Sequence, residues 1–135
     1  MDKITKIKYA VDQVIGQGNF VVVDSIFSEN YIAHSGEKTY KGHKFIKQFA
    51  KQIRKAIPNI KIKKVEILSE SDHVVTWQRF FIGTHKVSLK GIPASNKKIK
   101  WHEMVVSRFD NDNIIEEWIV SDLASQLMLK QKVNQ

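Results

Sequence analysis

The segment from Gly42 to Ile57 constrains the fold more than any other part of the sequence, because it is a strongly amphipathic helix that must bury one side. Lysines and one arginine occupy the other side, and Pro58-Asn59 ends the helix. Only strand patterns follow it, so we expect the helix to pack on a sheet formed by the second half of the chain. The apolar side consists of Phe45, Ile46, Phe49, Ala50, Ile53 and Ala56.

Four segments after this helix are rich in β-branched and aromatic residues and predict strands. Before it, residues 5–15 and 19–27 predict two helices and residues 29–34 a short extended piece, and a helical turn is expected at the end of the chain. Helices followed by an antiparallel sheet indicate an α+β architecture, with the N-terminal helices packed in a strongly curved sheet. Such a sheet leaves a concave apolar interior, where small ligands bind. The predicted strands are residues 60–68, 73–84, 99–109 and 114–121.

The composition is that of a globular protein with one hydrophobic core. The 135 residues are 42% hydrophobic and 27% charged, which predicts a single domain over residues 1–135. The absence of cysteine excludes a disulfide scaffold, a thiolate metal site and cysteine catalysis. No apolar run is long enough to span a membrane, and Met1 to Thr5 resemble no signal peptide, so we expect a cytoplasmic protein without membrane partners.

The net charge of +8 raises the question of a polyanionic partner. Ten lysines or arginines and no acid lie between Lys38 and Lys64, and this face could bind nucleic acid or an anionic surface. However, lysine outnumbers arginine 19 to 3, whereas recognition of bases and phosphates usually uses the arginine fork. We therefore interpret the lysines first as a solvated helix face and consider nucleic-acid binding unlikely.

Six short motifs, in order, resemble the SnoaL-like polyketide cyclases of the nuclear transport factor 2-like superfamily, over residues 20 to 129 or so. The resemblance implies a cone-shaped α+β barrel, usually paired as a homodimer through its sheet, with a pocket at the open end and no cofactor. The motifs are Gly42-His43-Lys44-Phe45-Ile46, Ala56-Ile57-Pro58-Asn59-Ile60, Gly83-Thr84-His85, Gly91-Ile92-Pro93-Ala94, Arg108-Phe109-Asp110 and Ile114-Ile115-Glu116-Glu117-Trp118-Ile119-Val120-Ser121-Asp122.

Asp122 is the first candidate for a catalytic residue. Strand alternation puts Trp118, Val120 and Asp122 on one face, and burial of that face in the cavity would raise the carboxyl pKa and suit proton abstraction. The resemblance implies that the matching aspartate acts as the acid/base group of an intramolecular aldol ring closure. Alternatively, Asp122 caps the helix that follows it.

His34 is the second catalytic candidate, because the resemblance places a pocket histidine near the end of this short strand. For substrate binding we single out Trp77, His102, Trp118 and Val120, since tryptophans on several strands favour a flat hydrophobic or aromatic ligand. No histidine or carboxylate spacing predicts a metal site. Many relatives carry an arginine shortly before Gly-Thr-His, and at this point the chain reads Trp77-Gln78-Arg79, so the arginine is expected to be displaced or to face outward.

Three hypotheses follow, of which the first is a cofactor-independent enzyme with Asp122 as base and His34 as its partner. The second is a non-catalytic protein that binds a small hydrophobic ligand in the same pocket. The third is a binder of nucleic acid or an anionic surface through the face from Lys38 to Lys64.

Overall fold

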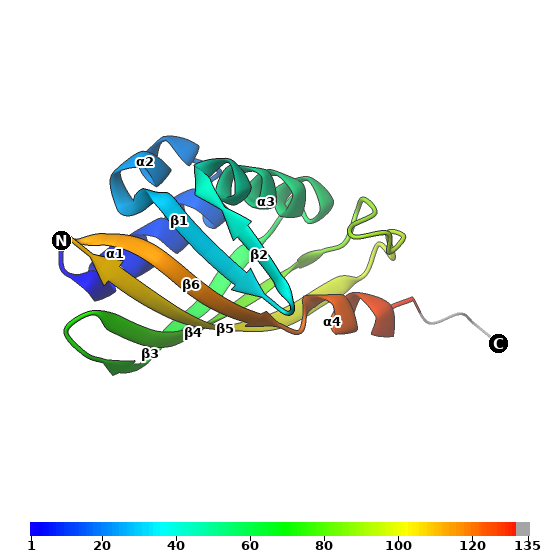
Figure 1. Cartoon of the computed structure of the whole chain (residues 1–135). Coiled ribbons are helices and arrows are strands. Elements are labelled where there is room, and N and C mark those ends of the chain that lie inside the picture. Colours follow the sequence, from blue (N-terminus) through cyan, green and yellow to red (C-terminus); the bar gives the residue numbers. More distant parts are fainter. Residues whose placement is uncertain (132–135) are drawn as a thin grey trace.

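The computed structural model describes residues 1–131, in which helices pack on one side of a curled six-stranded sheet (Figure 1). This α+β architecture is the one expected from the sequence. The elements are α1 (Lys3–Ala10), the π-helical turn η1 (Val11–Gly16), the 3-10 turn η2 (Phe20–Val22), α2 (Val23–Ile26), β1 (Phe27–Ser35), β2 (Lys38–Lys41), α3 (Gly42–Ala56), β3 (Lys61–Glu70), β4 (Val74–Thr84), β5 (Lys98–Asp110), β6 (Asn113–Ser121) and α4 (Leu123–Leu129).

The sheet has the strand order β2-β1-β6-β5-β4-β3, with β1 and β6 parallel and every other neighbouring pair antiparallel. The strands β3 to β6 follow one another as a meander, whereas the pairing of β1 with β6 joins the two ends of the chain. The edge strands β2 and β3 do not meet within residues 1–131, so the sheet is curled but not closed. The family resemblance implied a barrel, whereas the structure has an open, curled sheet.

Strand β2 is the one element of the sheet that the sequence did not predict. It has four residues, Lys-Thr-Tyr-Lys, and this stretch is too short and too polar to show an alternating pattern. It forms a hairpin with β1 around Gly36, whose φ of +63° is open to glycine without strain.

Helix α3 lies on the concave side of the sheet, as its amphipathic pattern required (Figure 1). Its buried side chains are Ile46, Ala50, Ile53 and Ala56, while Arg54 donates to the carbonyl oxygens of Ile15 and Gly16. No helix within residues 1–131 is both long and apolar enough to cross a membrane.

The long antiparallel pair β4–β5 forms part of the inner face of the sheet. Burial alternates residue by residue along both strands, so every second side chain points to the interior. The inward side chains are Val75, Trp77, Arg79 and Phe81 on β4, and Ile99, Trp101, Glu103, Val105, Ser107 and Phe109 on β5.

Gly83, near the end of β4, allows α3 and the sheet to approach closely. A Cβ atom at this position would lie 2.2 Å from Cγ2 of Ile57 and 3.3 Å from Cα of Ile60. We therefore predict that Gly83→Ala lowers the free energy of unfolding by about 1–3 kcal/mol, measured by urea denaturation. Adding Ile57→Leu, which removes the Cγ2 branch, should restore part of the loss. An unchanged urea midpoint for Gly83→Ala would contradict this account.

Candidate functional site

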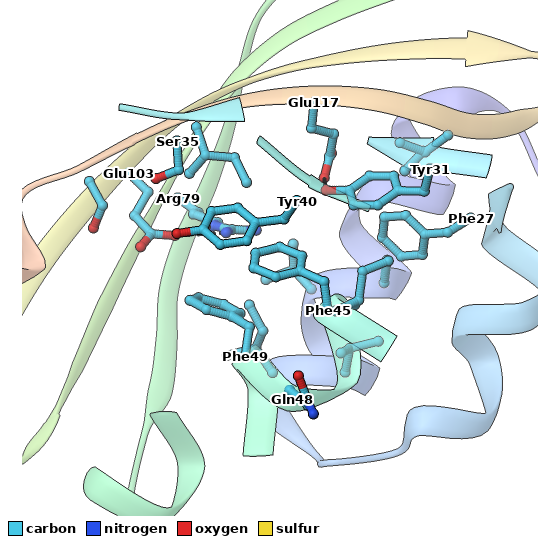
Figure 2. A pocket seen from close by; sticks show the side chains of 18 of the residues that line it. Phe27, Tyr31, Ser35, Tyr40, Phe45, Gln48, Phe49, Arg79, Glu103 and Glu117 are labelled. Atoms are coloured by element: carbon cyan, nitrogen blue, oxygen red, sulfur yellow. Dashed lines mark hydrogen bonds and ion pairs between the residues drawn. The ribbon is translucent and has the colours of Figure 1, made fainter. Parts of the chain in front are cut away.

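A cavity of about 580 Å³ lies between α3, the first helical segment and the inner face of the sheet. Its volume is in the range that accommodates small organic ligands. Most of its wall is aromatic or aliphatic, and Figure 2 shows Phe45 and Phe49 of α3 facing the polar groups of the strands. The aromatic residues that line it are Phe27, Tyr31, Tyr40, Phe45, Phe49 and Trp77.

Glu117 is the centre of a hydrogen-bonded group in this otherwise apolar wall. Its carboxyl group accepts a hydrogen bond of 2.8 Å from the Tyr31 hydroxyl and another of 2.5 Å from the hydroxyl of Ser107, which in turn accepts one of 2.9 Å from Trp77 Nε1. Figure 2 shows the Tyr31 and Glu117 side chains pointing toward one another. The Glu117 residue is only 5% exposed.

Burial governs the ionisation of both groups. Loss of hydration raises the pKa of Glu117 above its ordinary value, although Ser107, Arg79 and Tyr31 act in the opposite direction. Burial, and then the Glu117 charge, raise the pKa of Tyr31 well above its ordinary value. A carboxyl group with a raised pKa is a stronger proton acceptor than a solvated one, which is the property that a general base requires.

Arg79 and Glu103 form a buried ion pair on the same wall. They are direct cross-strand partners on β4 and β5, and Nε and a terminal nitrogen of Arg79 each lie 2.7 Å from Glu103 Oε1. The guanidinium carbon also lies 5.3 Å from the centre of the Trp77 ring. Figure 2 shows the Tyr40 hydroxyl pointing toward this pair.

The expectation that the arginine before Gly83-Thr84-His85 faces outward is wrong. Arg79 lines the cavity, because it occurs in the inward phase of β4 together with Trp77 and Phe81. The sequence of β4 does not reveal this phase, because apolar residues such as Val74, Phe80 and Ile82 also occupy its other face.

Trp118 and Val120 lie on the outer face of the sheet, which corrects the expectation that they contact a ligand in the cavity. They are 41% and 73% exposed, whereas Glu117, Ile119 and Ser121 line the cavity. The cause is an irregularity in the β5–β6 pairing. Phe109 pairs with Ile114 and Arg108 with Glu116, so Ile115 is an extra residue. Beyond it, the inward positions of β6 change from even to odd numbers.

His34 and His102 also lie outside the residues that line the cavity, whereas Trp77 lies among them. The ring of His34 stacks on Trp118 at 5.1 Å, and its Nε2 lies 2.6 Å from Glu116 Oε2. His102 stacks on Phe80 at 4.6 Å and makes a hydrogen bond of 2.7 Å to Gln78 Oε1. Both histidines therefore have partners on the outer face of the sheet.

Asp122 follows β6 and connects it to α4. Its Oδ1 accepts a hydrogen bond of 2.7 Å from the backbone N–H of His102, and Oδ2 accepts one of 3.4 Å from the Gln126 side chain. It occupies the cap position of α4 without a side-chain bond to a backbone N–H of that helix. Its carboxylate is outside the set that lines the cavity.

His34 and Asp122 are not brought together. His34 bonds to Glu116 and Thr39, whereas Asp122 bonds to the backbone N–H of His102 and to Gln126, so the two side chains have no partner in common. Within residues 1–131 no group of three or more histidine, aspartate or glutamate side chains could hold a metal ion.

Three polar residues of the cavity wall, Tyr31, Glu103 and Glu117, are not among the candidates that the sequence predicts. Glu103 was detectable, because it alternates with Trp101 and Val105 on a strand whose odd positions are apolar. Glu117 was not, since the extra residue Ile115 conceals the inward phase of β6.

A family model for SnoaL-like polyketide cyclases matches residues 5–129, and the chain belongs to this family. Among proteins with curated descriptions, none matches the sequence.

Solved structures agree with this assignment at the level of the fold. A protein from Jannaschia sp. CCS1 assigned as a SnoaL-like polyketide cyclase is 16% identical with a TM-score of 0.84, covering 97% of this chain and 92% of its own. One from Bacillus cereus assigned as a polyketide cyclase is 26% identical (TM-score 0.70, coverage 93% and 82%). AclR from Streptomyces galilaeus, assigned as a hydroxylase, is 16% identical (TM-score 0.76, coverage 98% and 100%). One fold thus carries different assigned activities.

The neighbouring carboxyl groups of Glu116 and Glu117 lie on opposite faces of β6, and we predict opposite pH dependences for them. Because its pKa is raised above 4.5, Glu117 makes a contribution to stability that is full below this pH and is lost as the pH rises. Hydrogen bonds from His34 and Arg108 lower the pKa of Glu116, so its contribution is present above 4.5 and is lost as the pH falls.

Urea denaturation between about pH 3 and 6 measures both effects. Glu117→Gln should become more stable relative to the parent protein as the pH rises, whereas Glu116→Gln should become less stable relative to it. The two variants serve as controls for one another. Parallel profiles would contradict the assigned environments.

Proposed function

We propose that this protein is a cofactor-independent enzyme that carries out acid/base chemistry on a small, largely apolar molecule in the cavity. The observation that supports this most is the Glu117 carboxyl group, buried on an apolar wall and held by the hydroxyl groups of Tyr31 and Ser107. Membership of the SnoaL-like polyketide cyclase family suggests the reaction class, an intramolecular aldol ring closure.

In such a ring closure a carboxylate accepts a proton from a carbon that lies next to a carbonyl group. The resulting enolate carbon attacks a second carbonyl of the same molecule, and the new alkoxide takes up the proton, so substrate and product are isomers. In our proposal Glu117 accepts and returns the proton, because burial raises its pKa. Arg79, whose charge acts on Glu117, is a cation able to stabilise negative charge on oxygen.

The proposal predicts that Glu117→Gln loses catalysis of proton exchange. A suitable probe is ethyl benzoylacetate in D₂O, in which loss of the protons between the two carbonyl groups is followed by NMR. Removal of a general base should lower the protein-dependent rate by about 10²–10⁴-fold. Thermal melting checks that the variant is folded.

Asp122→Asn is the matched variant, because it also replaces one carboxylate by its amide. If Asp122 only holds the His102 N–H, this variant should reduce the rate less than tenfold and lower the melting temperature. A large loss in Asp122→Asn with an unchanged rate in Glu117→Gln would transfer the role of base to Asp122 and overturn the assignment to Glu117.

A second candidate function is ligand binding without chemistry. It is favoured because the polar groups of the cavity wall already bond to one another. Both Glu117 oxygens accept hydrogen bonds, and Arg79 is paired with Glu103. A protein that retains an aromatic ligand, releases it chemically unaltered and exchanges no protons of the probe would be a binder of this kind.

We further propose that the outer face of the sheet binds a second copy of the chain. Met104, Trp118 and Val120 are 43%, 41% and 73% exposed there, and Met104 pairs with Val120 across β5 and β6. Contiguous exposed apolar side chains with a tryptophan are typical of protein interfaces.

This assembly predicts that Val120→Lys converts a dimer into a monomer, because it places a charge in an apolar contact. Val21→Lys is the control, since Val21 is 79% exposed on η2, away from the sheet. Sedimentation velocity gives the masses. A monomeric parent protein, or a dimeric Val120→Lys variant, would contradict the proposal.

A further inference from the structure

Three exposed lysine side chains line the cavity or the hollow beside it. Lys38 and Lys90 line the cavity itself, and a second hollow of about 450 Å³ shares Gln52 and Lys90 with it and adds Lys55. Figure 1 shows that the β1–β2 hairpin, the end of α3 and the loop between β4 and β5 lie at the same end of the molecule. The three lysines belong to these three segments. We call this region the lysine mouth.

The charge of the lysine mouth is not neutralised by the protein. Within residues 1–131, no carboxylate lies within 4.0 Å of the amino group of Lys38, Lys55 or Lys90, and none of these groups donates a hydrogen bond to another residue. By contrast, Arg79 deeper in the cavity is paired with Glu103. In the described part of the chain, the buried Arg79 in the cavity wall thus has an acidic partner, whereas the exposed lysines Lys38 and Lys90 have none.

Other polar side chains in the cavity wall suit the same kind of ligand. Gln48, Gln52 and Ser35 also line the cavity, and their amide and hydroxyl groups can donate hydrogen bonds to oxygen. The interior between Phe45, Phe49 and Trp77 is hydrophobic and suits an aromatic or aliphatic body. A ligand that satisfies both regions is an amphipathic anion.

We infer that the cavity takes an apolar molecule with a carboxylate group, and that Lys38 and Lys90 hold this carboxylate at the lysine mouth. The inference rests on the proposed function and names its substrate class. A lysine ammonium is a compact point charge with three donors, so it attracts a carboxylate without demanding the fixed geometry of an arginine fork. The apolar body then extends inward, toward Glu117.

The test compares two probes of the same shape, 2-naphthoate and its neutral amide, 2-naphthamide. Calorimetric titration should show that the parent protein binds the anion about tenfold more tightly, and that this preference declines as salt is raised. In the double variant Lys38→Gln/Lys90→Gln, the affinity for 2-naphthoate should fall to that for 2-naphthamide, and the affinity for 2-naphthamide should not change. Lys63→Gln/Lys100→Gln removes the same charge from exposed positions outside both hollows and should keep the preference.

Equal binding of the two probes by the parent protein, or a preference that survives in Lys38→Gln/Lys90→Gln, would overturn the inference. These outcomes leave the acid/base proposal standing, because proton exchange by Glu117 is measured on a neutral ester. Failure of both probes to bind would also overturn it. Conversely, loss of the role of Glu117 in exchange, with the anion preference intact, would overturn the acid/base proposal alone.

Discussion

The burial of the apolar side of α3 in the concave face of the sheet is the contact on which the rest of the structure depends. Helix α3 supplies Ile46, Ala50 and Ile53 to the core, and Gly83 on β4 permits the close approach of Ile57. Between a helix and a sheet that curls around it there is space that only side chains can fill. Their size and direction determine whether a cavity is left there. Here the aromatic side chains line a cavity of about 580 Å³ rather than closing it.

The polar groups inside this cavity are arranged by strand pairing. Arg79 and Glu103 face each other because β4 and β5 are in register, and Ser107 reaches Glu117 because β5 also pairs with β6. Each group obtains a partner that compensates for the water lost on burial. The polar residues that bond to one another in the cavity wall are therefore also the residues that a ligand in the cavity would contact. The same arrangement is consistent with catalysis by Glu117 and with ligand binding without chemistry.

The net charge of +8 has a more specific meaning in the structure than in the sequence. Lys44, Lys47 and Lys51 project from the solvent side of α3, and Lys47 lies 3.5 Å from Asp24. Lys38 and Lys90 instead line the cavity, and Lys55 and Lys90 line the hollow beside it. Cationic groups at the mouth of a low-dielectric cavity concentrate anions there.

The sequence by itself determined the elements and the layer architecture, because helical and strand periodicities are local properties of the chain. It predicted α3, the strands β3 to β6 and the concave interior, and the order of its motifs indicated the family. It could not determine which face of β6 is internal, because one extra residue at Ile115 reverses the phase of the strand. The uninterrupted alternation of the sequence therefore predicts Trp118 in the cavity, whereas the structure has Glu117 there. Only the tertiary structure brings Tyr31 to Glu117, 86 residues away, because the parallel pairing of β1 with β6 is a long-range contact that no local pattern encodes.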